Sequence, residues 1–144
     1  MTRLLSTKIL SKEFKEELLI NSISLIEQPF IKIRPIKKLE FTKSYQSIIF
    51  SSQNAVKIAL SNSKIKLLFD QKPTYCIGKK TALLLIKNGQ KVVKIAKNSS
   101  ELAHMIVKNF QNESFSFLCG KSRITDLEEI LSLNNILIQP IEIY

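Results

Sequence analysis

Residues 74–95 read TYCIGKKTALLLIKNGQKVVKI, and their pattern predicts a strand, a helix and a second strand in close succession. The first four residues are apolar or β-prone, Gly78 follows them, and residues 79–88 carry apolar side chains at helical spacing. Gly89 stands where helices commonly end in the left-handed region, and residues 91–95 form the next strand. This succession predicts a βαβ unit with parallel strands.

The same alternation extends on both sides of this stretch. Further strands are expected at residues 3–6, 46–50 and 115–119, an extended run at 135–144, and helices on the apolar stripes within 10–19, 55–60, 102–110 and 124–131. Ser11 is a candidate N-cap for the first helix. Residues 25–36 contain Pro29 and Pro35, and proline removes a ladder donor, so they are expected as edge strand or linker. The whole pattern predicts an α/β fold, a parallel sheet with helices on both faces.

The composition bounds the class of protein. The 144 residues are 44% hydrophobic and 24% charged, which suits a compact folded chain and excludes a disordered or collagen-like one. No apolar run is long enough to cross a bilayer and no secretory signal is visible, so we expect a cytoplasmic protein without a membrane partner. Cys76 and Cys119 are expected as small buried hydrophobes. With His104 as the single histidine, no metal site is expected.

The net charge is +10, and lysine carries almost all of it because the only arginines are Arg3, Arg34 and Arg123. A diffuse lysine field attracts polyanions, either a nucleic acid or a small molecule with several carboxylates or phosphates. The alternative explanation of the positive charge is a genome-wide bias toward lysine, which places the lysines on a solvated surface without a binding role. Residues 41–45 place aromatic rings beside a lysine and could stack bases, although such stretches are usually half-buried structure. No DNA-reading helix is evident, so specific nucleic-acid recognition is not expected.

Three strand-to-helix turns are candidates for ligand binding, at residues 50–55, 76–82 and 119–123. In an open parallel sheet, ligands bind beyond the carboxyl ends of the strands, where helix N-termini offer N–H groups to carboxylates or phosphates. Taken singly, the serines and threonine of these turns could be helix-start residues only. Three such turns together favour a binding site, and we expect them to lie on one edge of the sheet and to face one cleft.

Other catalytic and nucleotide-binding patterns find little support. A P-loop needs a glycine five positions before its Gly-Lys pair, but those positions hold Pro73 and Phe115. His104 lies on a helix among apolar residues, away from the turns. Glu128 and Glu129 are expected late in the last helix, on its solvated face. No nucleophile with an adjacent base is therefore indicated.

The turns and their order resemble one family, uroporphyrinogen-III synthase. Its motif Phe-Thr-Ser-x-Asn-Ala-Val is similar to residues 50–56, FSSQNAV, and its Val-Gly-x-x-Thr-Ala is similar to residues 77–82, IGKKTA. A glycine followed by an arginine and a leucine one helix turn apart matches Gly120, Arg123 and Leu127. Each match is short, whereas their order and spacing over nearly the whole chain are much more specific.

Two shorter matches lie near the ends of the chain. The family's opening Thr-Arg corresponds to Thr7 and Lys8, with lysine in place of arginine, and its Val-Tyr corresponds to Ile143 and Tyr144. By this resemblance Tyr144 is the catalytic candidate, because a neutral phenol can donate a hydrogen bond to a departing hydroxyl. The resemblance gives as substrate-binding candidates Thr7, Lys8, Ser51, Ser52, Asn54, Gly78, Lys79, Thr81, Gly120 and Arg123, with Lys121 as a further charge complement.

The resemblance implies a lyase of tetrapyrrole and haem biosynthesis that needs no metal or organic cofactor. It would close the linear tetrapyrrole hydroxymethylbilane to uroporphyrinogen III, with loss of water and inversion of the last pyrrole ring. That substrate bears eight carboxylates, which a lysine-rich cleft and helix N-termini suit. The difficult step is departure of hydroxide, for which an acid and a pocket that holds the inverting ring are needed.

The resemblance also implies two flavodoxin-like α/β lobes joined by a two-stranded connection. Residues 1–35 would be the N-terminal fragment of the first lobe, residues 36–139 the complete second lobe, and residues 140–144 the start of the return connection. The rest of the first lobe has no counterpart here, so the resemblance implies a C-terminally truncated member. A substrate meeting one wall of its cleft should give mainly the non-inverted isomer, which forms spontaneously.

Residues 1–35 would then lack packing partners, and Phe14, Leu18, Leu19 and Ile20 are expected to be left without a core. The segment should fray, or pair with the same segment of another chain, although the family is monomeric. Two other functions fit part of the sequence. One is a non-enzymatic, lysine-rich RNA-binding α/β domain. The other is a flavodoxin-like nucleotide or flavin module, against which the missing Gly-rich loop counts.

Overall fold

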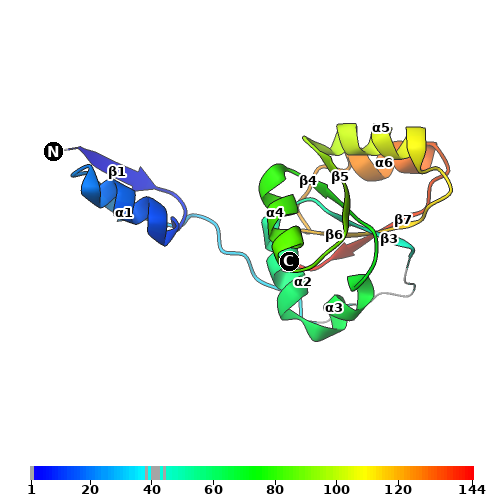
Figure 1. Cartoon of the computed structure of the whole chain (residues 1–144), viewed down its shortest axis with the longest axis horizontal. Coiled ribbons are helices and arrows are strands. Elements are labelled where there is room, and N and C mark those ends of the chain that lie inside the picture. Colours follow the sequence, from blue (N-terminus) through cyan, green and yellow to red (C-terminus); the bar gives the residue numbers. More distant parts are fainter. Residues whose placement is uncertain (1, 38, 40–42, 44) are drawn as a thin grey trace. The chain divides into compact units, whose positions relative to one another are not determined.

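The computed structural model describes residues 2–37, 39, 43 and 45–144. In it the chain divides into two compact units, Met1–Arg34 and Pro35–Tyr144, called unit 1 and unit 2 below (Figure 1). Part of the aromatic and basic stretch at 41–45, namely residues 41, 42 and 44, lies outside the described residues. Each unit is therefore considered by itself.

Unit 1 is one βαβ unit whose strands pair in parallel, with β1 (Arg3–Ser6), α1 (Lys12–Ile20) and β2 (Ser24–Glu27). Ser11 caps α1 as predicted, since its hydroxyl accepts a hydrogen bond from the Phe14 N–H at 3.3 Å. Residues 28–36 form neither helix nor strand, which confirms the prediction that this proline-containing stretch is no central strand.

The helix of unit 1 is only partly covered. It lies against β2, and Leu18 is buried, so the expectation that Leu18 lacks packing partners was wrong. Phe14, Leu19 and Ile20 remain exposed, with Ile20 at 83%. Three of the four apolar side chains that the sequence predicts to need a core are therefore exposed to solvent in unit 1.

Unit 2 contains, among its described residues, a five-stranded parallel sheet in the order β5-β4-β3-β6-β7. Its strands are β3 (Ser47–Phe50), β4 (Thr74–Ile77), β5 (Val92–Ala96), β6 (Phe115–Cys119) and β7 (Ile138–Glu142). The parallel pairing of β4 with β5 confirms the βαβ unit read from residues 74–95, and Gly89 closes its helix at a φ of +79°. Pro140 lies in β7 at the sheet edge, where a residue without an N–H is tolerated.

Helices cover both faces of this sheet (Figure 1), with α2 (Gln53–Ser61), α3 (Ser63–Phe69) and α4 (Lys79–Lys87) on one face and α5 (Ser99–Asn109) and α6 (Asp126–Leu133) on the other. Successive strand residues point to opposite faces, so Ile48 and Phe50 pack with the first group and Ile49 with the second. The buried apolar side chains form two cores, one on each face, which confirms the predicted α/β architecture.

Two helix assignments differ from the sequence prediction. The short helix α3 was not anticipated; Asn62 ends α2 and caps α3, accepting hydrogen bonds from the N–H groups of Lys64 and Ile65. Ile124 was assigned to the apolar stripe of the last helix, but it precedes α6 and is exposed at 71%. The helix begins two residues later because its first turn is acidic, which suits the positive end of the helix dipole.

Cys76 and Cys119 are buried on opposite faces of the sheet, as small hydrophobes in the two cores. This placement confirms the sequence interpretation and excludes a disulfide between them. Burial raises the pKa of the Cys76 thiol to about 11 and that of the Cys119 thiol to about 12. Within the described residues, no group of three or more His, Cys, Asp or Glu side chains could hold a metal ion, and no helix is long and apolar enough to cross a membrane.

We expect both thiols to resist a disulfide reagent at pH 8 in the folded chain and to react at once in denaturant. An unfolded thiol ionises near pH 8.5, whereas the folded thiols keep their protons to higher pH, so the free energy of unfolding should fall as pH rises above about 9. Urea unfolding between pH 8 and pH 10 measures this fall. Cys119→Ala should make it shallower, by at most about 1.4 kcal/mol per pH unit. An unchanged slope, or fast modification of the folded chain, would contradict the prediction.

Candidate functional site

The three turns singled out in the sequence lie on one edge of the sheet. They follow β3, β4 and β6, and because β3 pairs in parallel with both of the others, the carboxyl ends of all three strands meet at the same edge. The predicted common edge is therefore confirmed. This is the edge of a parallel sheet at which ligands bind.

Tyr144 reaches the first of these turns. Its hydroxyl lies 2.7 Å from the hydroxyl of Ser52, a contact between residues 92 positions apart in the sequence. Ser52 is at the same time the N-cap of α2, where its oxygen accepts a hydrogen bond from the Ala55 N–H at 3.1 Å. The catalytic candidate and one substrate-binding candidate are thus in direct contact. Nearby in the same turn, Ser51 is half-buried and Asn54 is exposed.

The third turn holds the backbone of Tyr144. The Lys121 N–H donates to the Tyr144 carbonyl at 2.8 Å, and the Ile143 N–H donates to the Cys119 carbonyl at 2.9 Å. Gly120 lies under the tyrosine ring, because a Cβ added there would come within 2.8 Å of Tyr144 Cε2. The tyrosine is therefore fixed from two sides, by the turn after β6 through its backbone and by the turn after β3 through its hydroxyl.

The second turn is built around Gly78, which is the N-cap of α4 at a φ of +86°. This backbone conformation favours glycine, and glycine supplies no side-chain oxygen to the first N–H groups of the helix. Thr81 is buried in the first turn of α4, whereas Lys79 is exposed. The turn can offer backbone N–H groups and a lysine to an anion at the same sheet edge.

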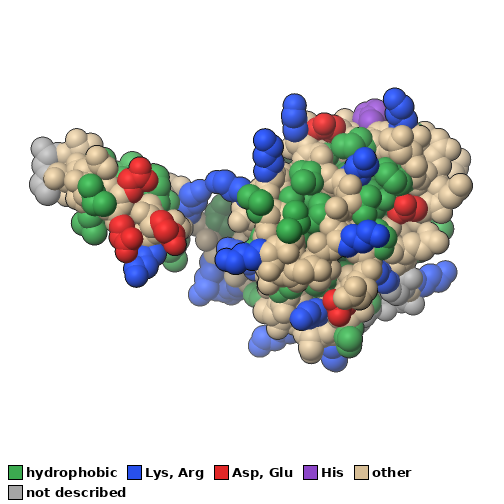
Figure 2. All heavy atoms as spheres, in the orientation of Figure 1, with side chains coloured by type: hydrophobic (Ala, Val, Ile, Leu, Met, Phe, Trp, Pro, Cys, Tyr) green, Lys and Arg blue, Asp and Glu red, His purple; other side chains and the backbone are tan. Residues whose placement is uncertain are grey.

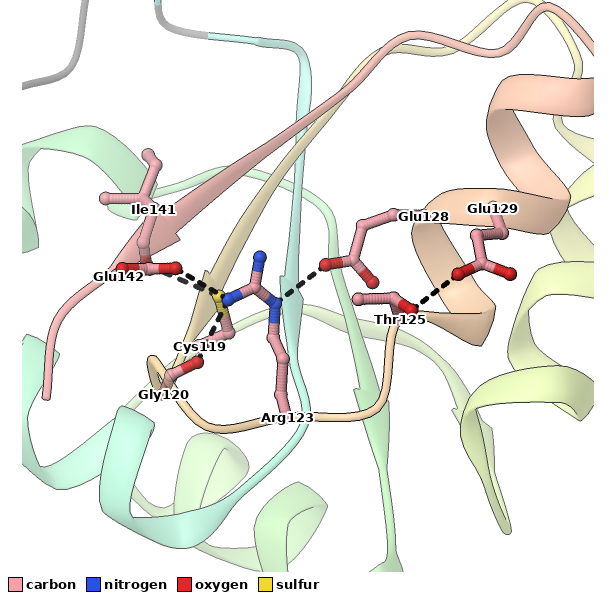
Figure 3. Close-up of polar contacts among 8 residues, drawn as sticks. All are labelled: Cys119, Gly120, Arg123, Thr125, Glu128, Glu129, Ile141 and Glu142. Atoms are coloured by element: carbon pink, nitrogen blue, oxygen red, sulfur yellow. Dashed lines mark hydrogen bonds and ion pairs between the residues drawn. The ribbon is translucent and has the colours of Figure 1, made fainter.

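Arg123 is held by acidic side chains (Figure 3). Its guanidinium donates from Nε to Glu128 at 2.7 Å and from Nη1 to Glu142 at 2.9 Å and to the Gly120 carbonyl at 3.2 Å. Burial acts to lower the pKa of Arg123, but the hydrogen bonds to Glu128 and Glu142 outweigh it and the pKa is raised. This cluster ties the turn after β6 to the start of α6 and to the end of β7, and a substrate role for Arg123 stays a prediction.

The sequence interpretation of the two glutamates was wrong about their position in the helix and about the exposure of Glu128, although Glu129 is exposed as expected. Glu128 and Glu129 lie in the first turn of α6, not late in it, and the Glu128 side chain is only 14% exposed. Glu129 accepts a hydrogen bond from the Thr125 hydroxyl at 2.6 Å. The run of acidic residues at 126–129 is itself typical of a helix N-terminus and could have placed the start of α6 correctly.

Three further candidates, Thr7, Lys8 and Lys121, are exposed, and so is His104. Thr7 and Lys8 belong to unit 1 and are exposed there. Lys121 is exposed beside Gly120. His104 is exposed on α5, with its Nδ1 atom 2.7 Å from the Ser100 carbonyl oxygen. Figure 2 shows lysine and arginine side chains spread over the visible face of unit 2 rather than gathered in one patch.

Comparison with known proteins supplies a further finding. The family model described as uroporphyrinogen-III synthase HemD matches residues 12–144. The chain is similar in structure to a mutant uroporphyrinogen III synthase from the extremely thermophilic bacterium Thermus thermophilus, with 10% identity, a TM-score of 0.62, and coverage of 99% of this chain and 61% of that one. It is also similar to uroporphyrinogen-III synthetase from Helicobacter pylori, with 17% identity, a TM-score of 0.59, and coverage of 99% and 61%. No match was found among curated proteins.

Proposed function

The chain belongs to the uroporphyrinogen-III synthase family, and on that premise we propose that it acts in closing hydroxymethylbilane to uroporphyrinogen III. The family is a lyase of tetrapyrrole synthesis. The chain spans 61% of the length of each structural relative described above, so the activity and the substrate are proposals for this protein. The observation that carries them is the contact of Tyr144 with Ser52 at the sheet edge where parallel α/β proteins bind ligands.

The Tyr144 hydroxyl would donate a proton to the hydroxyl that leaves the substrate. Carbon–oxygen cleavage then releases water, and the electron-rich pyrrole left behind carries the positive charge. For the inverted isomer, the methylene carbon that lost the hydroxyl bonds to the substituted α-carbon of the last pyrrole, and the bond from that α-carbon to the neighbouring bridge carbon breaks. The bridge carbon then bonds to the free α-carbon of the same ring, which loses a proton that can return to the tyrosine. The macrocycle and water are the only products, so atoms and charge balance.

The carboxylates of the substrate would meet positive charge and backbone N–H groups. Ser52 and Gly78 stand at the N-termini of α2 and α4, and Lys79 and Lys121 are exposed in the turns after β4 and β6. Helix N-termini and mobile lysines hold carboxylates without a bidentate arginine, which suits the engagement of Arg123 with glutamates. The other residues proposed to face the substrate are Ser51, Asn54, Thr81, Gly120 and Arg123 in unit 2, and Thr7 and Lys8 in unit 1.

Units 1 and 2 would correspond to a piece of one lobe and to the other lobe. In this proposal residues 140–144, which are the last part of β7 and the two residues after it, begin the return connection. The exposed Leu19 and Ile20 of α1 belong to an apolar face that takes a partner. A second copy of residues 1–35 is one such partner. Sedimentation equilibrium of the wild-type chain against Leu19→Lys/Ile20→Lys tests this, and a wild-type chain that stays monomeric at high concentration contradicts it.

The isomer ratio tests the function. Hydroxymethylbilane is incubated with residues 1–144, with the product of the whole reading frame that contains them, and without protein; the porphyrins are separated by chromatography after oxidation. We expect residues 1–144 alone to leave the non-inverted isomer dominant and the whole product to give mainly the type III isomer. A type III fraction equal to the protein-free control in both samples contradicts the proposed function.

A binding assay separates this function from RNA binding. Uroporphyrin III, with the same eight carboxylates, is titrated against residues 1–144 beside a single-stranded RNA over a range of salt concentrations. The proposed function predicts that the tetrapyrrole binds more tightly and competes with the RNA. RNA binding that falls steeply with salt and ignores the tetrapyrrole would favour the alternative.

A further inference from the structure

Resting on the proposed function, we infer that Ser52 and Gly120 are positioning residues that hold the Tyr144 hydroxyl in place for proton transfer. Ser52 fixes the hydroxyl through its 2.7 Å contact, and Gly120 leaves room for the ring to reach that place. Neither residue needs to touch the reacting atoms for this role. Ser52, in the turn after β3, and Gly120, in the turn after β6, thus both contact the side chain of Tyr144.

Either hydroxyl could donate in this contact, and our inference assigns the serine as the donor. A serine hydroxyl has one proton and two acceptor sites. One acceptor site of Ser52 takes the Ala55 N–H at the start of α2, and this leaves the serine proton available to the Tyr144 oxygen. The tyrosine proton then points away from Ser52 and toward a substrate. After the proton leaves, the same serine donates to the phenolate, and a hydrogen bond to a charged acceptor is the stronger kind.

Gly120 controls the ring by contact alone. An added Cβ would lie 2.8 Å from Cε2, 3.0 Å from Cζ and 3.3 Å from the hydroxyl oxygen of Tyr144. Only Gly78 and Gly89 of the described glycines have a positive φ, so an alanine at 120 meets no backbone strain. The Tyr144 carbonyl is held by the Lys121 N–H, and the ring must therefore turn away from the methyl group rather than slide. Gly120→Ala should thus move the hydroxyl off Ser52.

Proton NMR on the 144-residue chain tests the positions directly. The probe is the cross-peak between the Gly120 α-protons and the Tyr144 ring, with Tyr144→Phe used to assign the ring signals. We expect Ser52→Ala to weaken the cross-peak strongly and Ser52→Thr, which keeps the hydroxyl, to retain it. Gly120→Ala should shift the ring signals in the wild-type background, while in a Tyr144→Ala background it should cost no stability. Unchanged ring signals in both Ser52→Ala and Gly120→Ala would overturn the inference.

Ser52→Ala also removes the N-cap of α2, and the effect of losing a cap needs a matched control. Asn98 caps α5 on the other face of the sheet, where its oxygen accepts a hydrogen bond from the Glu101 N–H at 2.8 Å. Asn98→Ala removes a cap of the same kind, and a cap is worth about 1 kcal/mol. This variant should lose stability as Ser52→Ala does and yet leave the Tyr144 ring signals unchanged. Equal changes in the ring signals of both variants would show a structural effect only.

Kinetics separate the inference from the proposed function. In the product of the whole reading frame, Ser52→Ala should lower kcat about 10-fold with little change in KM, because one hydrogen bond to a charged group is lost, and Ser52→Thr should restore it. An inactive wild-type protein contradicts the proposed function. In that case the Tyr144 ring signals still test whether Ser52 and Gly120 hold the tyrosine in place. An active wild-type protein whose Ser52→Ala variant keeps full turnover overturns the inference and leaves the proposed function standing.

Discussion

Replacing Arg123 by methionine should lower the free energy of unfolding of unit 2 by about 2–3 kcal/mol. The substitution leaves Glu128 without its cation, and that side chain is only 14% exposed. Glu142, at 42% exposed, is better solvated, so the loss stays below the range found when a fully buried ion pair is broken. Urea unfolding followed by circular dichroism measures the change.

Partner substitutions sharpen this expectation. Glu142→Gln should cost little because water already screens that carboxylate, whereas Glu128→Gln should cost more. The double variant Arg123→Met/Glu128→Leu should regain much of the stability, since an apolar pair of similar size leaves no buried charge. A loss below about 1 kcal/mol for Arg123→Met alone would show that the pairs act as ordinary surface ion pairs.

The sheet and its order of elements follow from local patterns. Residues 74–95 predict β4, α4 and β5 because each signal lies within the element itself: an apolar strand, a helical stripe and a glycine at a φ of +79°. The edge position of β7 agrees with Pro140 for the same kind of reason. The common edge of the three turns is also predictable, since it needs only parallel strands.

The contacts that build the site are not local, and for that reason the sequence does not show them. Ser52 and Tyr144 are 92 positions apart, and nothing in either neighbourhood says that their hydroxyls meet. Gly120 has no positive φ, so its need for glycine comes from the ring of Tyr144, which follows another strand, β7. The family resemblance gives Arg123 as a substrate ligand, whereas its ion pair with Glu142 at the end of β7 cannot be seen in the sequence around either residue.

Short elements and helix boundaries were the other weak points. The helix α3, Ser63–Phe69, has seven residues, too few for its apolar stripe of Ile65 and Phe69 to stand out from a loop. Leu18 is buried within unit 1, where α1 contacts β2, and β2 is an edge strand as expected. In both places the packing partner, not the periodicity, decides the outcome.

If the proposed function holds, Tyr144→Phe in the product of the whole reading frame should lower turnover about 100-fold while KM for hydroxymethylbilane changes little. Phenylalanine keeps the ring that packs against Gly120 and the core, and it removes only the hydroxyl that contacts Ser52. A proton donor lost in the transition state lowers kcat and kcat/KM together, whereas a lost binding contact raises KM alone. Stopped assays of the type III isomer over a range of substrate concentrations give both constants.

Tyr45→Phe is the matched control for this prediction. It removes the same atom from a tyrosine that precedes β3. Tyr45 therefore lies at the amino ends of the strands, whereas the three turns follow their carboxyl ends, and the substitution should leave turnover unchanged. Tyr75 is unsuitable, because its hydroxyl donates to Glu113 at 3.1 Å and its loss would leave that carboxylate short of a partner. Unchanged formation of uroporphyrinogen III by Tyr144→Phe would remove the tyrosine from the mechanism. A rise in KM with kcat intact would make it a binding residue, and the positioning contacts of Ser52 and Gly120 would then serve affinity and not proton transfer.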